Sequence, residues 1–543
     1  MVLRSLGHRA PLLWVVVPYA VGIVAGRALP GLPVIPALAG AGVALGVGFA
    51  GAATRPRLWA LGLTTALVLI GAAAYTLQRA RLPAWNTLPP REARVGLHLD
   101  HIFAPRWEQQ VSGLATIIRT DPHLRDLIGQ RIYFSLRLGP GESRPTRTAE
   151  IDAIGVIEQL PETAPGFAGH LAATGINFTF TRGRVLGETR APTPLRRFCD
   201  ATLRRFAAIL GTGTAEKQPG FTAVLRAMLL GQKQELDEAQ DELFLRSGTM
   251  HLFAISGLHI AAIAAGIEAL LLLLRAPRLP RIGAGLLLVW LYVQVTGGAP
   301  SAVRAFAMVA LFQAMRLGRR PGNPLAALAA AALAVLAVDP LQLFSVSFQL
   351  SYGVVAALLL YGLPLGETWQ ARFPAFPHLP RATWRWWHHL IATAWRGGLG
   401  AAGIAVAAGL VSWVTGVAFF GLFIVAAPLA NLVLVPLATW VILAGMGSLL
   451  TGLTGFAAAS ALCNHAALLV LWGMEAGIRR MVAWPGTAVP AAFPHEALGP
   501  AAFAGLLTLF AWGYHRRWRG ITASSWLPPG LVVALLIFGV NFG

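Results

Sequence analysis

The sequence predicts a polytopic α-helical membrane protein with one small β-barrel domain outside the membrane. Of its 543 residues, 56% are hydrophobic and only 12% are charged, whereas a soluble protein carries about 25% charged residues. Apolar runs recur along the chain at a length close to the ~20 residues that one bilayer crossing requires. They indicate about 11–13 transmembrane helices, and the stretch between residues 78 and 220 lacks such runs.

The candidate spans fall into an N-terminal group and a longer C-terminal group. We expect about three helices in residues 1-77 and the others in residues 249-543, which we interpret as the transmembrane core. Their approximate ranges are 11–29, 33–53, 58–77, 249–274, 282–298, 301–316, 322–338, 341–363, 390–415, 417–454 (one helix or two), 457–478, 499–515 and 526–541.

The net charge of +20 has a topological explanation. Much of the excess lies in short loops between apolar runs, such as Arg55/Arg57 and Arg275/Arg278/Arg281. Because short cytoplasmic loops are enriched in Lys and Arg, we place these loops inside. Residues 78–220 then lie outside, and the run 249–274 begins on the external side. Of the two cysteines, one falls in the external segment and one in a span, so we expect neither a disulfide nor a cysteine-based metal site.

Residues 78-200 are expected to form the extracytoplasmic domain. Apolar and polar residues alternate in its strand-like runs, for example Ile132, Phe134 and Leu136 against Tyr133 and Ser135. Five short strands in about 100 residues favour a small barrel such as an OB-fold. The five runs are Arg94–Phe103, Val111–Arg119, Gln130–Leu138, Glu150–Leu160 and Gly175–Leu186.

An OB-fold often binds single-stranded nucleic acid through basic grooves and aromatic stacking. The charge gives weak support, because residues 90–190 carry 12 basic and 11 acidic side chains, and an ordinary barrel surface is the alternative. The residues that we expect to form one nucleic-acid-binding face are Arg106, Trp107, Arg119, Arg131, Tyr133, Arg137, Arg182 and Arg184.

Residues 201-248 are expected to form amphipathic linker helices. The stretch Phe221–Gly248 contains five acidic residues between positions 235 and 242. Such a cluster can hold a cation or contact basic loops, but we interpret it as a solvated face along the membrane surface.

Four groups of polar residues, here called polar stations, interrupt the apolar core. The first contains His251, Ser256, Gly257 and His259, at the start of the run that ends at Leu274. Polar groups at membrane depth are costly unless they pair or line an aqueous path. Gly257 weakens the helix and allows close backbone approach.

The second station is the segment Thr296–Arg304, in which Gly297, Gly298 and Pro300 break one helix and Arg304 enters the next. An arginine there should face a partner or an aqueous cavity.

The third station contains Ser347, Gln349 and Ser351, and the fourth contains Asn431, five residues before Pro436. Each station alone can serve as contact between helices. Together the four indicate a hydrophilic route through the bundle.

Catalytic patterns are sparse. His251 and His259 are eight residues apart, which is not the i, i+4 spacing of a zinc protease helix, and no phosphate-binding GxxxxGK[ST] string occurs. We assign no catalytic residue, metal or cofactor, and we expect the chain not to be an enzyme.

Several strings resemble the ComEC family of competence proteins. They are Gly248-Thr-Met-His-Leu-Phe-Ala-Ile-Ser-Gly-Leu-His259, Thr296-Gly with Ser301 and Arg304-Ala305, Asp339-Pro340 with Ser347-Phe-Gln-Leu-Ser351, and Asn431 with Pro436. Pro165-Gly-Phe167 through His170-Leu171 to Gly175-Ile176 also resembles the end of that family's external OB domain.

The resemblance implies a channel that moves transforming DNA, as a single strand, across the cytoplasmic (inner) membrane. DNA would arrive through an external receptor protein, and a cytoplasmic ATPase or helicase would supply energy. Many members carry a β-lactamase-like nuclease domain, and we do not carry this role over to residues 1–543. Either a separate nuclease does that work, or the sequence is a piece of a longer chain, or this member differs from the family. The alternatives are a small-molecule or ion transporter with an external barrel, and an intramembrane enzyme that uses His251, Ser256 and His259.

Overall fold

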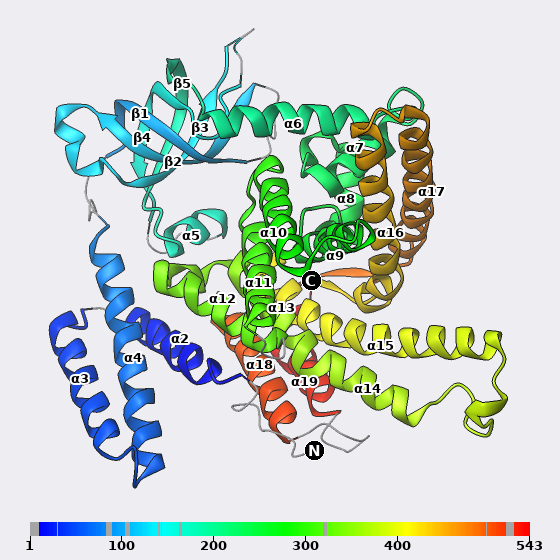
Figure 1. The fold of residues 1–543 in the computed structure, drawn as a ribbon. Helices are drawn as coiled ribbons and strands as arrows, with labels where there is room; N and C mark the ends of the chain where they lie inside the picture. The colour runs from blue at the N-terminus through cyan, green and yellow to red at the C-terminus, as the bar shows by residue number, and fades with distance from the viewer. Residues whose placement is uncertain are drawn as a thin grey trace.

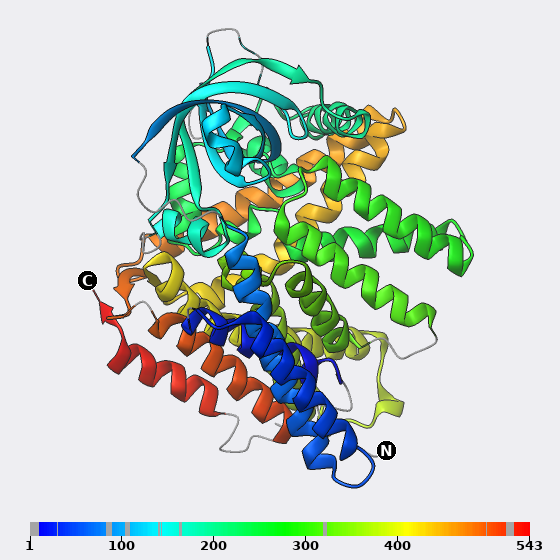
Figure 2. The same ribbon diagram turned by 90° about the vertical axis from the view of Figure 1, so that its left-hand side faces the viewer.

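The computed structural model describes most of the chain. The described residues are 10–29, 31–82, 89–103, 109–139, 142, 144–161, 166–318, 323–495, 497–516 and 526–542. A β-barrel lies at one end of the molecule and the N-terminal helices lie at the other, with the remaining helices between and beside them (Figures 1 and 2).

Three helices precede the barrel: α2 (Leu13–Ala28), α3 (Val34–Ala50) and α4 (Pro56–Ala80). Small residues bring them close together. A Cβ atom at Gly48 would lie 3.2 Å from the Gly62 Cα atom, so α3 and α4 pack backbone against backbone. The three helices that the sequence predicts before the barrel are therefore present.

Five strands then close into a barrel in the order β1-β2-β3-β5-β4. Neighbours pair antiparallel, except that β3 and β5 run parallel. All five predicted runs are therefore strands, within a few residues at each end. Their bounds are Arg91–Ile102 (β1), Gln110–Thr120 (β2), Arg131–Arg137 (β3), Glu150–Gln159 (β4) and Phe178–Arg190 (β5).

Alternating side chains fill the barrel, because successive residues of a strand point to opposite faces. Leu97, Ile117, Phe134 and Phe180 are fully buried inside it. Two short helices lie in its connections, η1 (Pro122–Leu127) and α5 (Gly166–Ala173). In Figure 1, α5 lies between the strands and the helices below them.

The linker between barrel and core contains α6 (Pro194–Leu210), α7 (Pro219–Leu230), the turn η2 (Lys233–Glu235) and α8 (Glu238–Arg246). The acidic residues of α8 are exposed, as predicted. We expected amphipathic helices here, and α7 is more deeply buried than a helix with one solvated face, because eight of its twelve residues are buried. They pack against α16 and α17 in one apolar cluster.

The core continues with helices joined mostly by short connections. After the turn η3 (Met250–Leu252) come α9 (Gly257–Leu273), α10 (Arg278–Val295), α11 (Pro300–Leu317), α12 (Pro324–Val338), η4 (Pro340–Phe344), α13 (Val346–Ala357), the π-helical turn η5 (Leu358–Gly362), α14 (Leu363–Arg372), η6 (Arg381–Thr383), α15 (Trp386–Thr415), the π-helical turn η7 (Gly416–Phe420), α16 (Ala427–Leu453), α17 (Ala457–Val482), α18 (Leu498–Arg516) and α19 (Leu527–Gly539).

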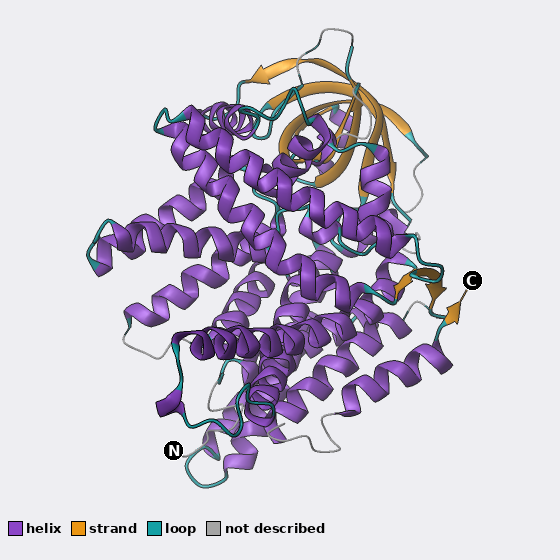
Figure 3. Ribbon diagram, turned by 90° about the vertical axis from the view of Figure 1, so that its right-hand side faces the viewer, coloured by secondary structure: helices purple, strands orange, loops and turns teal. Residues whose placement is uncertain are grey.

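The range 417–454, expected to hold one helix or two, is one long helix, α16, after a break. Short strands lie in that break, between α17 and α18, and after α19. Figure 3 shows them as a small sheet near the C-terminus, in the order β6 (Leu422–Ile424), β7 (Ala488–Ala492) and β8 (Asn541–Phe542).

Within the described residues, six helices are long and apolar enough to cross a membrane. Shorter apolar helices occupy several other expected ranges, such as Leu13–Ala28 and Pro324–Val338. The polytopic helical class is thereby confirmed, whereas the total of about 11–13 spans stays a prediction. The six are Pro56–Ala80, Met250–Leu273, Val346–Arg372, Trp386–Phe420, Ala427–Leu453 and Ala457–Val482.

Buried apolar side chains divide the helices into two large cores. One unites α2, α12, α13, α15, α18 and α19, and the other unites α6, α7, α9, α16 and α17. A smaller cluster holds α9, α10 and α11 together. The boundary between α11 and α13, here called the seam, is where the smaller cluster meets the first core.

Candidate functional site

The first polar station forms the start of α9. Ser256 is the residue before the helix, and its hydroxyl lies 2.9 Å from His259 Nδ1. The Ser256 backbone N–H also donates to Nδ1, at 3.3 Å. This is the reciprocal arrangement of a capping box, with histidine in the place of the usual Glu or Gln. It satisfies Nδ1 of the fully buried His259, whereas its Nε2 has no hydrogen-bond partner among the described residues.

The second station is joined to the first. α10 ends at Val295, and Gly297 and Gly298 follow with φ angles of +92° and +64°, a left-handed conformation that glycine adopts readily. The chain then enters α11, where the Ser301 hydroxyl donates to the Ile255 carbonyl at 3.1 Å. Ile255 immediately precedes the Ser256 cap, so this bond fixes the start of α11 against the start of α9.

Arg304 connects the second station to the third across the seam. Its Nη2 atom donates to the Ser347 carbonyl at 2.8 Å, to the Ser347 hydroxyl at 2.5 Å and to the Ser351 hydroxyl at 3.0 Å. Only 4% of Arg304 is exposed. A buried guanidinium costs free energy when no carboxylate is among its hydrogen-bond partners. The Nε atom of Arg304 also has no partner among the described residues.

The remaining predicted residues of the core lie around these bonds. His251 is exposed, with Nδ1 3.0 Å from the Gly248 carbonyl. Gly257 faces Ala305 at 3.9 Å, measured from the position of an added Cβ. Gln349 donates to the Leu343 carbonyl at 3.0 Å. Asn431 is buried near the start of α16, a helix that packs on α9. The structure therefore joins the first three stations by hydrogen bonds and places Asn431 on a neighbouring helix.

The barrel presents a strip of polar residues along β3. Arg131, Tyr133, Ser135 and Arg137 alternate with buried residues and so point outward. Arg184 of β5 pairs with Arg137 and extends the strip. Arg119 does not belong to it, because it lies opposite Gly96 of β1 and forms an ion pair with Asp152 of β4 at 2.9 Å.

Arg182 is an exposed residue at an irregularity of β5, with a φ angle of +55°. Two further predicted residues, Arg106 and Trp107, lie outside the described residues.

An aromatic cluster adjoins the strip, and sequence reasoning found only one of its members. Tyr133 lies 6.2 Å from Phe103 and 5.5 Å from Phe167, measured between ring centroids. His101 lies 5.4 Å from Phe103. Phe167, on α5, is 55% exposed. The signal that could have revealed Phe167 was a large apolar residue in a loop otherwise rich in Gly, Ala and Pro.

The electrostatics of this region come mainly from arginines. Asp100 accepts a hydrogen bond from Thr116 at 2.7 Å and forms an ion pair with Arg131 at 3.5 Å. Burial, and then the charges of Arg147 and Arg131, lower the pKa of His101 below its usual value. His101 is therefore neutral near pH 7 and acts as part of the aromatic cluster.

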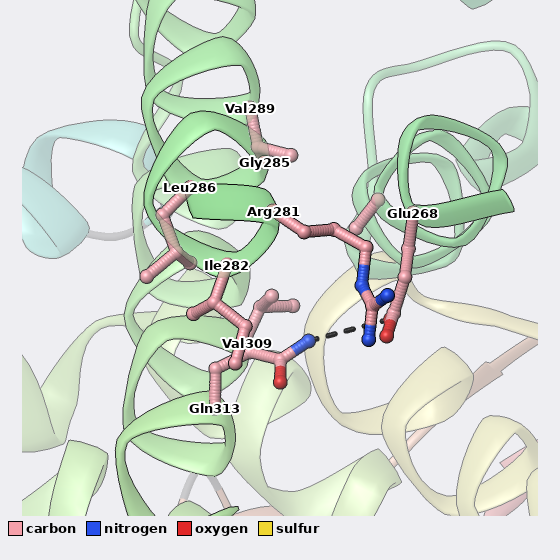
Figure 4. A pocket seen from close by; sticks show the side chains of 9 residues that line it. Glu268, Arg281, Ile282, Gly285, Leu286, Val289, Val309 and Gln313 are labelled. Carbon is pink, nitrogen blue, oxygen red and sulfur yellow. Dashed lines mark hydrogen bonds between the residues drawn. The ribbon is translucent and has the colours of Figure 1, made fainter. Parts of the chain in front are cut away.

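A small pocket between α9, α10 and α11 was also missed (Figure 4). Its polar lining is Glu268, Arg281 and Gln313; apolar residues such as Ile282 and Val289 complete it. Gln313 donates to Glu268 at 3.4 Å, and Arg316 forms an ion pair with Glu268 at 3.5 Å. The available signal was Glu268 itself, the one acidic residue in the apolar run 249–274.

Comparison with known proteins places these features in a family. The family model described as "Competence protein" matches residues 228–516, slightly more than half of the chain. That range contains all four polar stations.

Among curated proteins, the chain is similar to ComE operon protein 3 of Bacillus subtilis, with 31% identity over 142 residues, which cover 26% of this chain and 18% of that protein. Recombination protein 2 of Haemophilus influenzae is 31% identical over 147 residues, 25% of this chain and 18% of that protein. Competence protein ComA of Neisseria gonorrhoeae is 34% identical over 145 residues, 25% of this chain and 21% of that protein. The chain thus matches about a fifth of the length of these relatives. No solved structure matches it.

Proposed function

Because this chain belongs to the competence protein family, we propose that it forms the route by which transforming DNA crosses the cytoplasmic membrane as a single strand. The observation that carries the proposal is Arg304, a buried arginine held by Ser347 and Ser351 at the seam. Ionisable residues inside membrane segments commonly mark the pathway of a substrate or an ion.

The chemistry of the seam suits a polyanion. A single DNA strand carries one negative charge per nucleotide, and its path through a low-dielectric region needs cations or water along it. A phosphate oxygen is a stronger acceptor for a guanidinium than a carbonyl or a hydroxyl is. In this proposal Arg304 exchanges its bonds to Ser347 and Ser351 for a phosphate when the seam opens.

The barrel supplies the second part of the proposal. We interpret it as an OB-fold on the external side of the membrane, since it is a closed five-stranded barrel with one parallel pair. Its strip of Arg131, Tyr133 and Arg137 lies beside the exposed Phe167 ring. Base stacking on aromatic rings together with a basic groove is the usual mode of sequence-independent strand binding.

The position of α5 links the two parts. Arg79 of α4 donates to the Ala172 carbonyl of α5 at 3.2 Å, and a Cβ atom at Gly175 would lie 2.7 Å from Leu341 of η4. η4 leads directly into α13, which carries Ser347 and Ser351. A DNA strand that is bound at Phe167 would therefore enter the molecule beside η4, the segment that leads into α13 at the seam.

In this proposal the residues of the chain bind and guide the strand and catalyse no step. An external receptor delivers the DNA, and a cytoplasmic ATPase or helicase drives its movement.

The test is the import of fluorescently labelled DNA into cells that depend on this chain for uptake. Arg304→Glu should reduce import by at least about tenfold, the equivalent of about 1.4 kcal/mol, because it places a repulsive charge on the path. Arg304→Lys keeps the charge but loses the guanidinium fork. Its import rate should therefore lie between that of the native chain and that of Arg304→Glu. Membrane levels of each variant are measured in parallel.

The matched control is Arg372→Glu, which reverses an exposed charge at the end of α14. It should import at the native rate. An Arg304→Glu chain that reaches the membrane and imports as fast as the native chain would refute the role of Arg304 in the path.

A further inference from the structure

Two arginines from the barrel side hold the break between α10 and α11. Arg147, in the connection from β3 to β4, donates from Nη1 to the Gly297 carbonyl at 3.1 Å. Arg196, in the first turn of α6, donates from Nη1 to the Gln294 carbonyl at 3.0 Å. Both acceptors lie at the C-terminal end of α10, where the carbonyls carry partial negative charge; the Gln294 carbonyl also accepts from the Gly297 N–H at 3.2 Å.

These two bonds stabilise an unusual piece of backbone. Gly297 and Gly298 are both left-handed, and a side chain at Gly298 would collide with the Arg147 guanidinium. The same segment continues into Ser301 and Arg304, which position α9 and α13. The two arginines therefore connect the barrel to the residues at the seam.

The arginines are incompletely neutralised. Arg196 is paired with Asp200, but its buried Nε has no partner among the described residues. Arg147 donates from Nε to the Asp100 carbonyl at 2.8 Å, while the Asp100 carboxylate is engaged by Thr116 and Arg131. The two guanidiniums lie near each other, because the carbonyls that they contact are only three residues apart. Burial, and then the charge of Arg196, lower the pKa of Arg147, while Asp100 opposes this shift.

We propose that Arg147 and Arg196 form a binding site for a backbone phosphate of single-stranded nucleic acid, and that phosphate binding draws them from the Gly297 and Gln294 carbonyls. The inference rests on the proposed function and adds to it a site between the barrel strip and the seam. Asp100 connects the strip to this site, because its carboxylate forms an ion pair with Arg131 of the strip and its carbonyl accepts a hydrogen bond from Arg147.

The energetics favour the exchange. A charge-assisted bond to phosphate is roughly twice as strong as a neutral one, and an anion between the two guanidiniums removes their repulsion. Uncapping the end of α10 then loosens the break that leads to Arg304. By linkage, any state in which the break is loose binds the strand more tightly, by the same factor.

The first experiment measures the salt dependence of binding of a fluorescent oligothymidine to the full chain in lipid nanodiscs. Each phosphate that the protein neutralises contributes about 0.7 to the slope of log affinity against log salt for a single strand. Because the two arginines neutralise one phosphate, the Arg147→Gln/Arg196→Gln double variant should lower the slope by about that amount, and each single variant should lower it by part of that amount. Arg147→Lys, which keeps the charge, should retain the native slope.

Two matched controls accompany these variants. Arg197→Gln removes an exposed charge from the next residue of α6, and Arg125→Gln removes one from η1 of the same barrel. Neither should change the slope. If Arg147→Gln and Arg196→Gln leave the slope at the native value while the chain still binds the oligonucleotide, the phosphate site is refuted and the proposed function is not.

The second experiment measures amide hydrogen exchange of residues 296–299 with and without saturating oligothymidine. Exchange should accelerate on binding in the native chain. In the Arg147→Gln/Arg196→Gln double variant it should already be fast without the oligonucleotide. If the variants have reduced salt slopes but oligothymidine does not change the exchange rates of the native chain, the phosphate contact is supported. The proposal that phosphate binding frees the Gly297 and Gln294 carbonyls is then overturned. Absence of any binding by the native chain would overturn both this inference and the strand-binding role of the barrel.

Discussion

The Nη2 atom of Arg304 donates a hydrogen bond of 3.0 Å to the Ser351 hydroxyl, and this bond joins α11 to α13 at the seam. Arg304 cannot easily find water as a substitute partner, because it is 4% exposed; Ser351 is half-buried. The same guanidinium nitrogen also bonds to Ser347. These polar contacts add to the apolar packing of Met308 and Leu311 of α11 against the first core.

Ser351→Ala should lower the stability of the chain. Hydrogen bonds to charged groups contribute about 1.5–3 kcal/mol, and the variant removes one of them without creating a large cavity. Thermal unfolding of the purified protein in detergent, followed by the fluorescence of its 17 tryptophans, would report the change. Ser412→Ala, at a half-buried serine of α15, is the control and should unfold at the native temperature. Equal unfolding temperatures for the two variants would contradict the role given to the Arg304–Ser351 bond.

Phe167→Ala should weaken the binding of single-stranded DNA to the full chain. Stacking of one base on an aromatic ring contributes about 1–3 kcal/mol, equivalent to a loss of roughly 5- to 150-fold in affinity. The slope against salt should not change, because no charge is removed. Ile128→Ala, at an exposed apolar residue of the same barrel, is the control. A loss of affinity no larger than that of Ile128→Ala would exclude Phe167 from the binding surface.

The barrel was largely predictable because each strand carries its own signal. Ile132, Phe134 and Leu136 are buried while Arg131, Tyr133 and Ser135 point outward, as their alternation indicates. The strand order of the barrel was not predictable, because pairing of β3 with β5 depends on contacts between residues far apart in sequence. For the same reason the sequence revealed Tyr133 but not its packing partner Phe167.

The core was predictable in its helices but not in its contacts. The break at Gly297 and Gly298 was visible, since consecutive glycines before a proline seldom continue a helix. The partners of Arg304 were not, because the spacing of Ser347 and Ser351 shows only that they share a helix face. Long-range contacts also explain the deep burial of α7, whose apolar residues pack against α16 and α17, helices that lie much later in the sequence.

Lowering the pH should destabilise the barrel, and His101→Gln should reduce that effect. Burial, and then the charges of Arg147 and Arg131, opposed by Asp100, hold the pKa of His101 below its unfolded value of about 6.5. The unfolded chain therefore takes up more protons below that pH, and stability falls as the pH drops through 6.5 towards the folded pKa. Burial lowers the pKa of His170 in the same direction.

The measurement is the unfolding temperature between pH 7 and pH 5. His123→Gln, at an exposed histidine of η1, is the control and should keep the native dependence on pH. If His101→Gln and the native chain lose stability in parallel, burial of His101 does not determine the response.

Gly403→Ala should separate α14 from α15. An added Cβ atom would lie 2.6 Å from the Gly366 nitrogen and 2.7 Å from the Gly362 carbonyl oxygen, and backbone atoms cannot move aside as a flexible side chain can. Overpacking of this kind typically costs about 1–3 kcal/mol. Gly397→Ala in the same helix meets open space and should stabilise by about 0.5–1 kcal/mol. Thermal unfolding distinguishes them, and a Gly403→Ala chain as stable as Gly397→Ala would disprove the close packing.

Glu268→Gln should destabilise the chain only slightly, and the loss should shrink as salt is added. The carboxylate of Glu268 and the guanidinium of Arg316 are 34% and 41% exposed, and ion pairs exposed to this degree contribute about 0.2–1 kcal/mol. The variant keeps the shape of the side chain and its contact with Gln313. The control is a double-mutant cycle with Arg316→Gln, in which the coupling energy should fall between low and high salt because exposed charges are screened. A coupling above about 3 kcal/mol that does not respond to salt would instead mean that Glu268 and Arg316 form a desolvated pair, and the pocket in Figure 4 would then be closed to water.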